Sequence, residues 1–285
     1  MRIVLFLLTN FAVMAVLLLT TKLLGLDSTL GDSYGSLFGF ALVIGMGGSL
    51  FSLFISKWMA KRSMGVEIID PSNIREKELQ WLYQKIAEIS YKAGIKTPEF
   101  GIYHGAPNAF ATGWNKNDAL VAVSTGLLEV MDHDEIEGVL AHEIGHVANG
   151  DMVTLSLIQG VINALVIFLA RIIGNIIDKA VFKSRDGYGI GYYASVFIAE
   201  MVLGVLASII VMWFSRYREF RADEASAHLV GTHKMVAALQ RLQSLRDNPP
   251  LPKEMAAFGI SGGGVMELFS SHPPLHKRIE NLTRL

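Results

Sequence analysis

Four long runs of apolar residues divide the chain. They cover Ile3–Leu19, Tyr34–Ile55, Met152–Ile177 and Tyr192–Phe214. Each approaches or exceeds the roughly 20 residues that an α-helix needs to cross a bilayer. A cleaved signal peptide is the alternative for the first run, but no small-x-small cleavage site follows it and a second run begins soon after. The pattern therefore predicts four transmembrane helices.

Polar and small residues inside the runs add detail. Arg171 and Glu200 stand in the third and fourth runs, and charged groups at bilayer depth usually face protein or water. They could pair with each other, Arg171 could snorkel to the interface, or these two runs could lie partly inside the protein. The second run is rich in glycine, so we expect it to pack closely against another span.

Basic residues predict the orientation of the chain. The loop 25–31 has no Lys or Arg, whereas Lys57, Lys61 and Arg62 follow the second run and further arginines follow the fourth. Three basic residues in loop 178–191 weaken the argument. On balance, we expect both termini and the segment 57–150 in the cytoplasm.

The polar segments between and after the runs predict a compact soluble part. In the first, apolar residues at helical spacing predict a helix that Ser72 caps, and a capping-box pattern at Asp132 and Glu135 predicts a second helix that runs to about Asn149. Short strands are expected at Glu99–Tyr103, Asn108–Thr112 and Ala119–Ser124. The predicted organisation is thus a transmembrane hairpin (1–56), a soluble part (57–151), a second hairpin (152–214) and a C-terminal soluble part (215–285).

Composition agrees with a membrane protein. Hydrophobic residues make up 51% and charged residues 18% of the chain, where soluble proteins carry about a quarter charged residues. The net charge of −1 and the lack of a basic stripe argue against a nucleic-acid partner. The chain has no cysteine, which excludes disulfides, thiolate metal sites and cysteine nucleophiles. Any metal site must therefore use His, Asp and Glu.

The sequence His142-Glu143-Ile144-Gly145-His146 lies on the second predicted helix. Two histidines four residues apart share a helix face and can bind one zinc ion. Glu143 lies about 100° further round the helix, from where a carboxylate can act as general base on water activated by the metal. We interpret Gly145 as a small residue that keeps the substrate side open. The motif predicts a zinc peptidase with Glu143 as its catalytic base.

Zinc needs a third protein ligand. A metzincin would have a histidine shortly after Gly150, and none is there, so a more distant carboxylate is favoured. Glu219 and Asp223 share a helix face, so that one could ligate zinc while the other holds a ligand imidazole. A solvated pair with neighbouring arginines is the alternative. Arg278 could pair with Asp223. The downstream candidates are Glu219, Asp223, Glu224, His228 and His233.

Three motifs in this order resemble the M48 metallopeptidases, and the resemblance runs over essentially the whole chain. They are His142–His146, Glu219-Phe220-Arg221-Ala222-Asp223 and Ser271-His272-Pro273-Pro274-Leu275. The resemblance implies a mainly α membrane protein with a small sheet and a gluzincin-like domain, with one Zn²⁺ held by His142, His146 and Glu219. It also implies a stress-linked inner-membrane protease that degrades damaged or misfolded membrane proteins, with its site facing the cytoplasm.

Two further assignments follow from the resemblance. Asn108, Ala109 and Phe110 resemble the edge strand that pairs with the substrate backbone in zinc proteases; a buried strand with a turn asparagine is the alternative. His272 is implied to lie near the active site, where it could donate a hydrogen bond to the oxyanion. A packing residue at a helix start is the alternative for His272.

Two other functions compete with proteolysis. One is a membrane scaffold or chaperone with a silent site, which the intact Glu143 argues against. The other is a small-molecule transporter, which is prompted by the polar residues in the third and fourth runs. Four spans and a cytoplasmic metal-binding helix argue against a transporter.

Overall fold

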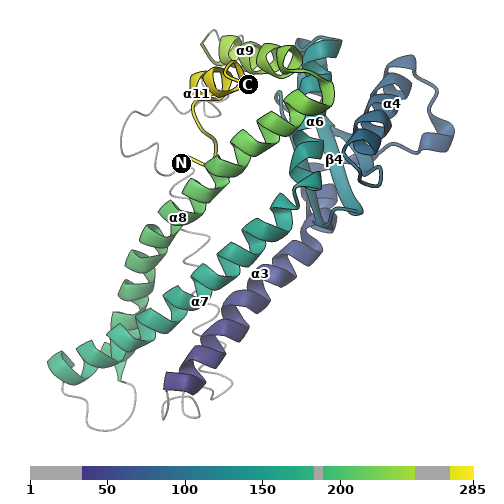
Figure 1. The fold of residues 1–285 in the computed structure, drawn as a ribbon. Coiled ribbons are helices and arrows are strands. Elements are labelled where there is room, and N and C mark those ends of the chain that lie inside the picture. The colour runs from purple at the N-terminus through teal and green to yellow at the C-terminus, as the bar shows by residue number, and fades with distance from the viewer. Residues whose placement is uncertain (1–33, 183–188, 248–269) are drawn as a thin grey trace. The chain divides into compact units, whose positions relative to one another are not determined.

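The structure is a computed structural model, and it describes residues 34–182, 189–247 and 270–285 (Figure 1). Three helices in this part are long and apolar enough to cross a membrane: Gly35–Met64, Asp151–Phe182 and Ile190–Val230. They contain the second, third and fourth apolar runs. The first run lies outside the described residues, so the count of four spans stays a prediction.

The chain forms two compact units. We call residues 1–51 and 156–212 the helical unit, and residues 52–155 and 213–285 the mixed unit. Helices α3 (Tyr34–Met64), α7 (Asp151–Ile177) and α8 (Ile190–Val230) contribute to both. The predicted division into four parts stays a prediction.

Close approaches at glycine join the helices of the helical unit. A Cβ atom on Gly45 of α3 would overlap the backbone of Ala164 in α7, and one on Gly174 of α7 would overlap Val196 in α8. Without a side chain at these points the helix backbones can pack directly, as small residues allow in lipid. The expected packing of the glycine-rich run is therefore present at Gly45.

The charged residues of the third and fourth runs form a pair. Arg171 Nη1 donates to Glu200 Oε1 at 3.3 Å, and both side chains are buried. The Arg171 guanidinium also lies 5.2 Å from the centroid of the Phe40 ring. Burial excludes snorkelling for Arg171, and the pairing offsets the cost of two charges in an apolar unit.

A four-stranded mixed sheet organises the mixed unit, in the order β1-β2-β4-β3. The strands are β1 (Glu67–Ile68), β2 (Glu99–Tyr103), β3 (Ala109–Asn115) and β4 (Asp118–Ser124). Strands β2 and β4 are parallel, and the other two pairs are antiparallel. Strand β3 extends three residues beyond the predicted Thr112, because it forms a tight hairpin with β4. Among the described residues, β3 is an edge strand.

The sheet and the helices of the mixed unit enclose one main core. Helix α6 packs on β3, β4, α4 and α9, and the core includes Ile86, Phe100, Val121, Leu140 and Ile144. The remaining helical elements are η1 (Pro71–Asn73), α4 (Lys77–Lys92), α5 (Thr125–Val130), α6 (His133–Ala148), η2 (Asp178–Phe182), α9 (Thr232–Asp247) and α11 (Leu275–Leu282).

The observed starts of α6 and α4 can be compared with the caps predicted at Asp132 and Ser72. The box at α6 is present: the Asp132 side chain accepts from the Glu135 backbone N–H, and the Glu135 side chain accepts from the Asp132 backbone N–H. The start predicted at Ser72 is wrong. Asp70 accepts from Ser72 and caps only the short turn η1, and α4 begins at Lys77. Pro71 favours this turn because its fixed φ suits the first helical position.

Candidate metal centre

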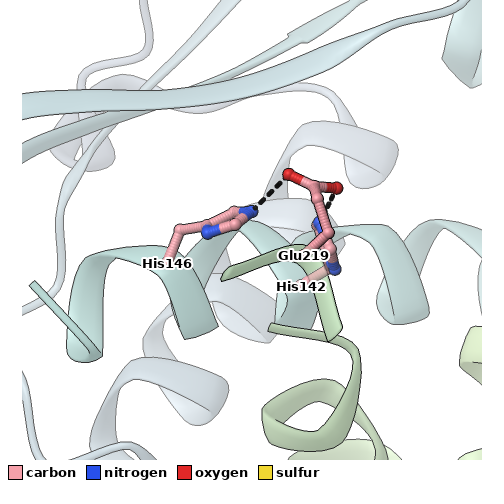
Figure 2. A group of neighbouring side chains, drawn as sticks. All are labelled: His142, His146 and Glu219. Atoms are coloured by element: carbon pink, nitrogen blue, oxygen red, sulfur yellow. Dashed lines mark ion pairs between the residues drawn. The ribbon is translucent and has the colours of Figure 1, made fainter. Parts of the chain in front are cut away.

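Helices α6 and α8 bring His142, His146 and Glu219 together. One ligand atom from each lies within 4.8 Å of the others. Figure 2 shows the Glu219 carboxylate between the two imidazoles, with one oxygen directed at each ring. The distances are 3.6 Å from His142 Nε2 to Oε2 and 3.4 Å from His146 Nε2 to Oε1. The two Nε2 atoms and the carboxylate thus converge on one point.

A buried carboxylate lies behind each imidazole. Asp223 Oδ1 is 3.0 Å from His142 Nδ1, and Asp151 Oδ2 is 2.7 Å from His146 Nδ1. An Nδ1–H that donates to a carboxylate leaves Nε2 with its lone pair free to bind a metal. Both histidines are therefore held in the tautomer and orientation that a metal ligand needs.

Asp151 was not predicted from the sequence. It stands five residues after His146, beyond the end of α6, and so does not share a face with the motif. Gly150, with φ +68°, separates α6 from α7, and the side chain of Asp151, the first residue of α7, contacts His146 Nδ1. The sequence signal that could have indicated Asp151 is an acidic residue directly after the glycine that ends α6.

Arg278 of α11 joins the carboxylates. Its Nε and Nη2 donate to the two Asp223 oxygens at 2.8 and 2.6 Å, and Nη1 lies 3.2 Å from Glu219 Oε2. The guanidinium is buried, so this bidentate pair is geometrically specific. The pairing of Arg278 with Asp223 considered from the sequence is present, and it ties the C-terminal helix to the site.

The electrostatic field of the site favours positive charge. Burial opposes charging of either imidazole. The hydrogen bonds that Asp223 and Glu219 accept nevertheless raise the pKa of His142, and those that Asp151 and Glu219 accept raise the pKa of His146 to about 10. A cation that replaces these protons would meet the same carboxylates.

Glu143 and His272 lie at the margin of this cluster. Glu143 is half-buried, and its carboxylate acts electrostatically on His146 and Arg278. His272 Nδ1 is 2.8 Å from Glu219 Oε2, while its side chain remains 65% exposed. Both side chains are therefore close to the converging ligand atoms and reachable from solvent.

The predicted substrate strand also lies beside α6. Ala109 and Phe110 pair with Val123 and Ala122 of β4, and Asn108 donates its backbone N–H to Ser124 Oγ. The three residues are exposed or partly exposed. Ala109 also packs against the core of the mixed unit, so the segment is only partly buried, and its role as a substrate strand stays a prediction.

The interpretation of Gly145 is wrong. Gly145 is buried, and a Cβ there would lie 3.0 Å from Ala225 Cβ and 3.3 Å from the Ala222 carbonyl oxygen of α8. The glycine therefore serves helix packing instead of substrate access. It lets α8 approach α6 closely enough for Glu219 to reach the histidines.

The donor set fits zinc. Two imidazole nitrogens and one carboxylate oxygen are a ligand combination of catalytic zinc sites, which keep a further position open. Both ligand histidines have the carboxylate partners that such sites use. The Glu219 and Asp223 carboxylates face the two imidazoles, so a divalent cation held there would meet opposite charge.

A membrane-associated metallopeptidase is the class of protein that this fold and donor set fit. The chain belongs to peptidase family M48, whose sequence pattern matches residues 76–285. The resemblance seen in the motifs is confirmed.

Known relatives cover the full chain. It is 61% identical over 287 residues to Protease HtpX of Pseudomonas paraeruginosa, which covers 99% of this chain and 98% of the relative. It is 59% identical over 290 residues to Protease HtpX of Ectopseudomonas mendocina, with coverage of 100% and 99%. The crystal structure of S. mikatae Ste24p shares the fold, with a TM-score of 0.66 at 17% identity over 96% of this chain and 65% of that chain. The chain is thus a membrane metalloprotease.

Asp151→Asn tests the carboxylate behind His146. The amide keeps the shape of the side chain but loses the charge that holds Nδ1–H, so we expect zinc affinity or activity to fall by about 10- to 100-fold. Zinc titration with a competing chelator measures the affinity. Asp134→Asn, on the exposed first turn of α6, is the matched control and should bind zinc like the wild type. Equal zinc affinities for both variants would show that Asp151 does not support zinc binding.

Proposed function

We propose that the protein is a zinc-dependent endopeptidase of the inner membrane that hydrolyses damaged or misfolded membrane proteins on the cytoplasmic side, as part of a stress response. The observation that carries this proposal is the convergence of His142 Nε2, His146 Nε2 and the Glu219 carboxylate. Membership of family M48 and three membrane-capable helices support it.

In the proposed reaction, His142, His146 and Glu219 would hold one zinc ion. Zinc supplies a Lewis acid that lowers the pKa of water to about 7. Glu143 takes a proton from the attacking water and delivers it to the leaving amine. The buried Asp151 and Asp223 keep the two imidazoles oriented while charge develops at the scissile carbonyl.

The proposed substrate lies along β3 in an extended conformation. Asn108, Ala109 and Phe110 would pair with its backbone, because an edge strand can add one more strand. His272 is proposed to donate a hydrogen bond to the oxyanion, since its exposed ring lies next to Glu219. Backbone pairing is tolerant of side chains, which suits a protease that removes many different misfolded chains.

Cleavage assays with and without metal test the proposed function. Purified protein should cleave casein and an unfolded membrane protein, lose both activities on chelation, and regain them with zinc. A metal-free protein that cleaves at the wild-type rate would contradict the proposal. Cleavage of casein alone would contradict the membrane-protein substrate.

The proposed topology places both termini in the cytoplasm with four spans. A reporter that is active only in the cytoplasm should be active after Leu285 and inactive in the loop 178–191, because the basic residues next to the second and fourth runs favour the cytoplasmic side. Enzyme activity of the two fusions, normalised to their amounts, measures this. An active fusion in the loop would mean that the third and fourth runs do not cross the membrane.

A further inference from the structure

The tip of the β3–β4 hairpin carries an exposed tryptophan that the proposed reaction does not use. Trp114 is 43% exposed. It stands at an irregularity in the pairing of β3 with β4, between Gly113 and Asn115. Such a bulge breaks the alternation of a strand and redirects the side chain of the extra residue. The bulge therefore presents the indole on the surface.

The indole meets an exposed aromatic side chain of α3. The Trp114 and Phe54 ring centroids are 5.7 Å apart, yet Phe54 is 66% exposed. Trp58, one turn further along the same face of α3, is 59% exposed. A contiguous apolar surface of this kind marks an interaction site, because water does not favour it.

Ion pairs hold the β3–β4 hairpin against the part of α3 around Lys57 and Lys61. Lys57 pairs with Asp118 at the start of β4 and, at 2.9 Å, with Glu99 at the start of β2. Lys61 also pairs with Glu99. The Trp114 Nε1–H donates to Asp118 Oδ2 at 2.8 Å. The hairpin tip and residues 54–61 of α3 are thus held together inside the mixed unit.

The part of α3 that begins at Lys57 coincides with the expected edge of the bilayer. Residues 34–56 of α3 contain no charged residue, and Lys57 is the first. At about 1.5 Å per residue, 23 helical residues span roughly 34 Å, close to the ~30 Å of the hydrocarbon core. Tryptophan is enriched at this boundary, where its ring is apolar and its N–H meets polar groups. The Trp114 indole has this arrangement, with Nε1 on Asp118 and the ring exposed.

We propose that the tip of the β3–β4 hairpin inserts Trp114 into the headgroup layer of a phospholipid bilayer that contains anionic lipid. Phe54 and Trp58 of α3 complete the apolar surface. Lys96 and Lys116 are exposed beside the tip, and basic residues near a membrane surface attract anionic headgroups. The occupant of this surface is therefore the lipid that already surrounds α3.

The anchor has a consequence that rests on the proposed function. Strand β3 leads from the tip at Asn115 to Ala109, a distance on the order of 20 Å along an extended strand. A lipid-bound tip would thus hold the proposed substrate strand within that reach of the membrane. A segment pulled from the bilayer could meet the site after only a few extended residues.

The absence of cysteine makes a depth measurement direct. A nitroxide on Lys116→Cys reports the hairpin tip, and one on Tyr91→Cys, at an 87% exposed position of α4, is the aqueous control. Both full-length proteins are reconstituted in vesicles with anionic phospholipid. We expect collisions with a water-soluble nickel complex to be severalfold less frequent at Lys116→Cys than at Tyr91→Cys. Equal collision rates would overturn the proposal.

A second variant tests the role of the indole. Trp114→Ser in the Lys116→Cys protein should raise the nickel collision rate of the label towards that of Tyr91→Cys. An unchanged, low collision rate would show that Trp114 is not the anchor. Circular dichroism and the unfolding midpoint verify that the variant is folded. Because the label reports depth without any cleavage, failure of this proposal and failure of the proposed function remain distinguishable.

Discussion

Glu143→Gln should retain one zinc ion per chain and lose proteolysis. His142, His146 and Glu219 are unchanged in this variant, and Glu143 makes none of the contacts that bring them together. The amide cannot accept a proton, so we expect turnover to fall by about 10²- to 10⁴-fold, the usual contribution of general acid–base catalysis. Cleavage of a protein substrate, measured beside the zinc content of the same sample, checks both parts.

A control variant and the zinc content make this result decisive. Glu129→Gln lies outside α6 and has none of these neighbours, so it should cleave like the wild type. Substantial activity of a folded, zinc-loaded Glu143→Gln protein would refute the assignment of the general base. Loss of zinc from the variant would instead show that Glu143 belongs to the metal-binding set.

Glu219→Ala should lose zinc and activity together, whereas Glu224→Ala should keep both. The two residues are five positions apart, about 140° around a helix, and only Glu219 reaches the imidazoles. Removal of Glu219 leaves two histidines, and catalytic zinc sites use three protein ligands. Zinc per chain after dialysis against a weak chelator gives the answer.

The Glu219→Ala variant also removes the carboxylate that Arg278 Nη1 and His272 Nδ1 contact. Arg278 keeps its bidentate contact with Asp223, so we expect the fold to survive with a lower unfolding midpoint. Glu219→Gln keeps the size of the side chain and should show the same loss of zinc affinity in a weaker form. If Glu224→Ala is the metal-free variant, the assignment of this face of α8 is wrong.

Local periodicity explains why much of the site could be predicted. His142 and His146 share a face because they are four residues apart, and the same rule joins Glu219 to Asp223. The three apolar helices follow from run length in the same way. The sequence also suggested the Arg171–Glu200 pair, because two opposite charges in an apolar environment are less costly when they pair.

The remaining features depend on how distant segments meet. Asp151 contacts His146 across the junction of α6 and α7, where Gly150 adopts φ +68°. Gly145 looked like an open position, and its role against Ala225 became evident only with α8 in place. The start of α4 was misplaced because Asp70 and Pro71 support a separate turn. Periodicity along one helix carries no information about which neighbour packs on it.

X-ray absorption at the zinc edge of the Glu143→Gln protein tests the central claim most directly. This variant should lack proteolytic activity and should hold one zinc ion per chain. We expect two imidazole nitrogens, from His142 and His146, and oxygen ligands, from Glu219 and water, all at about 2.0–2.2 Å. A spectrum with three or more imidazoles, or a purified protein that binds no zinc when zinc is supplied, would contradict it.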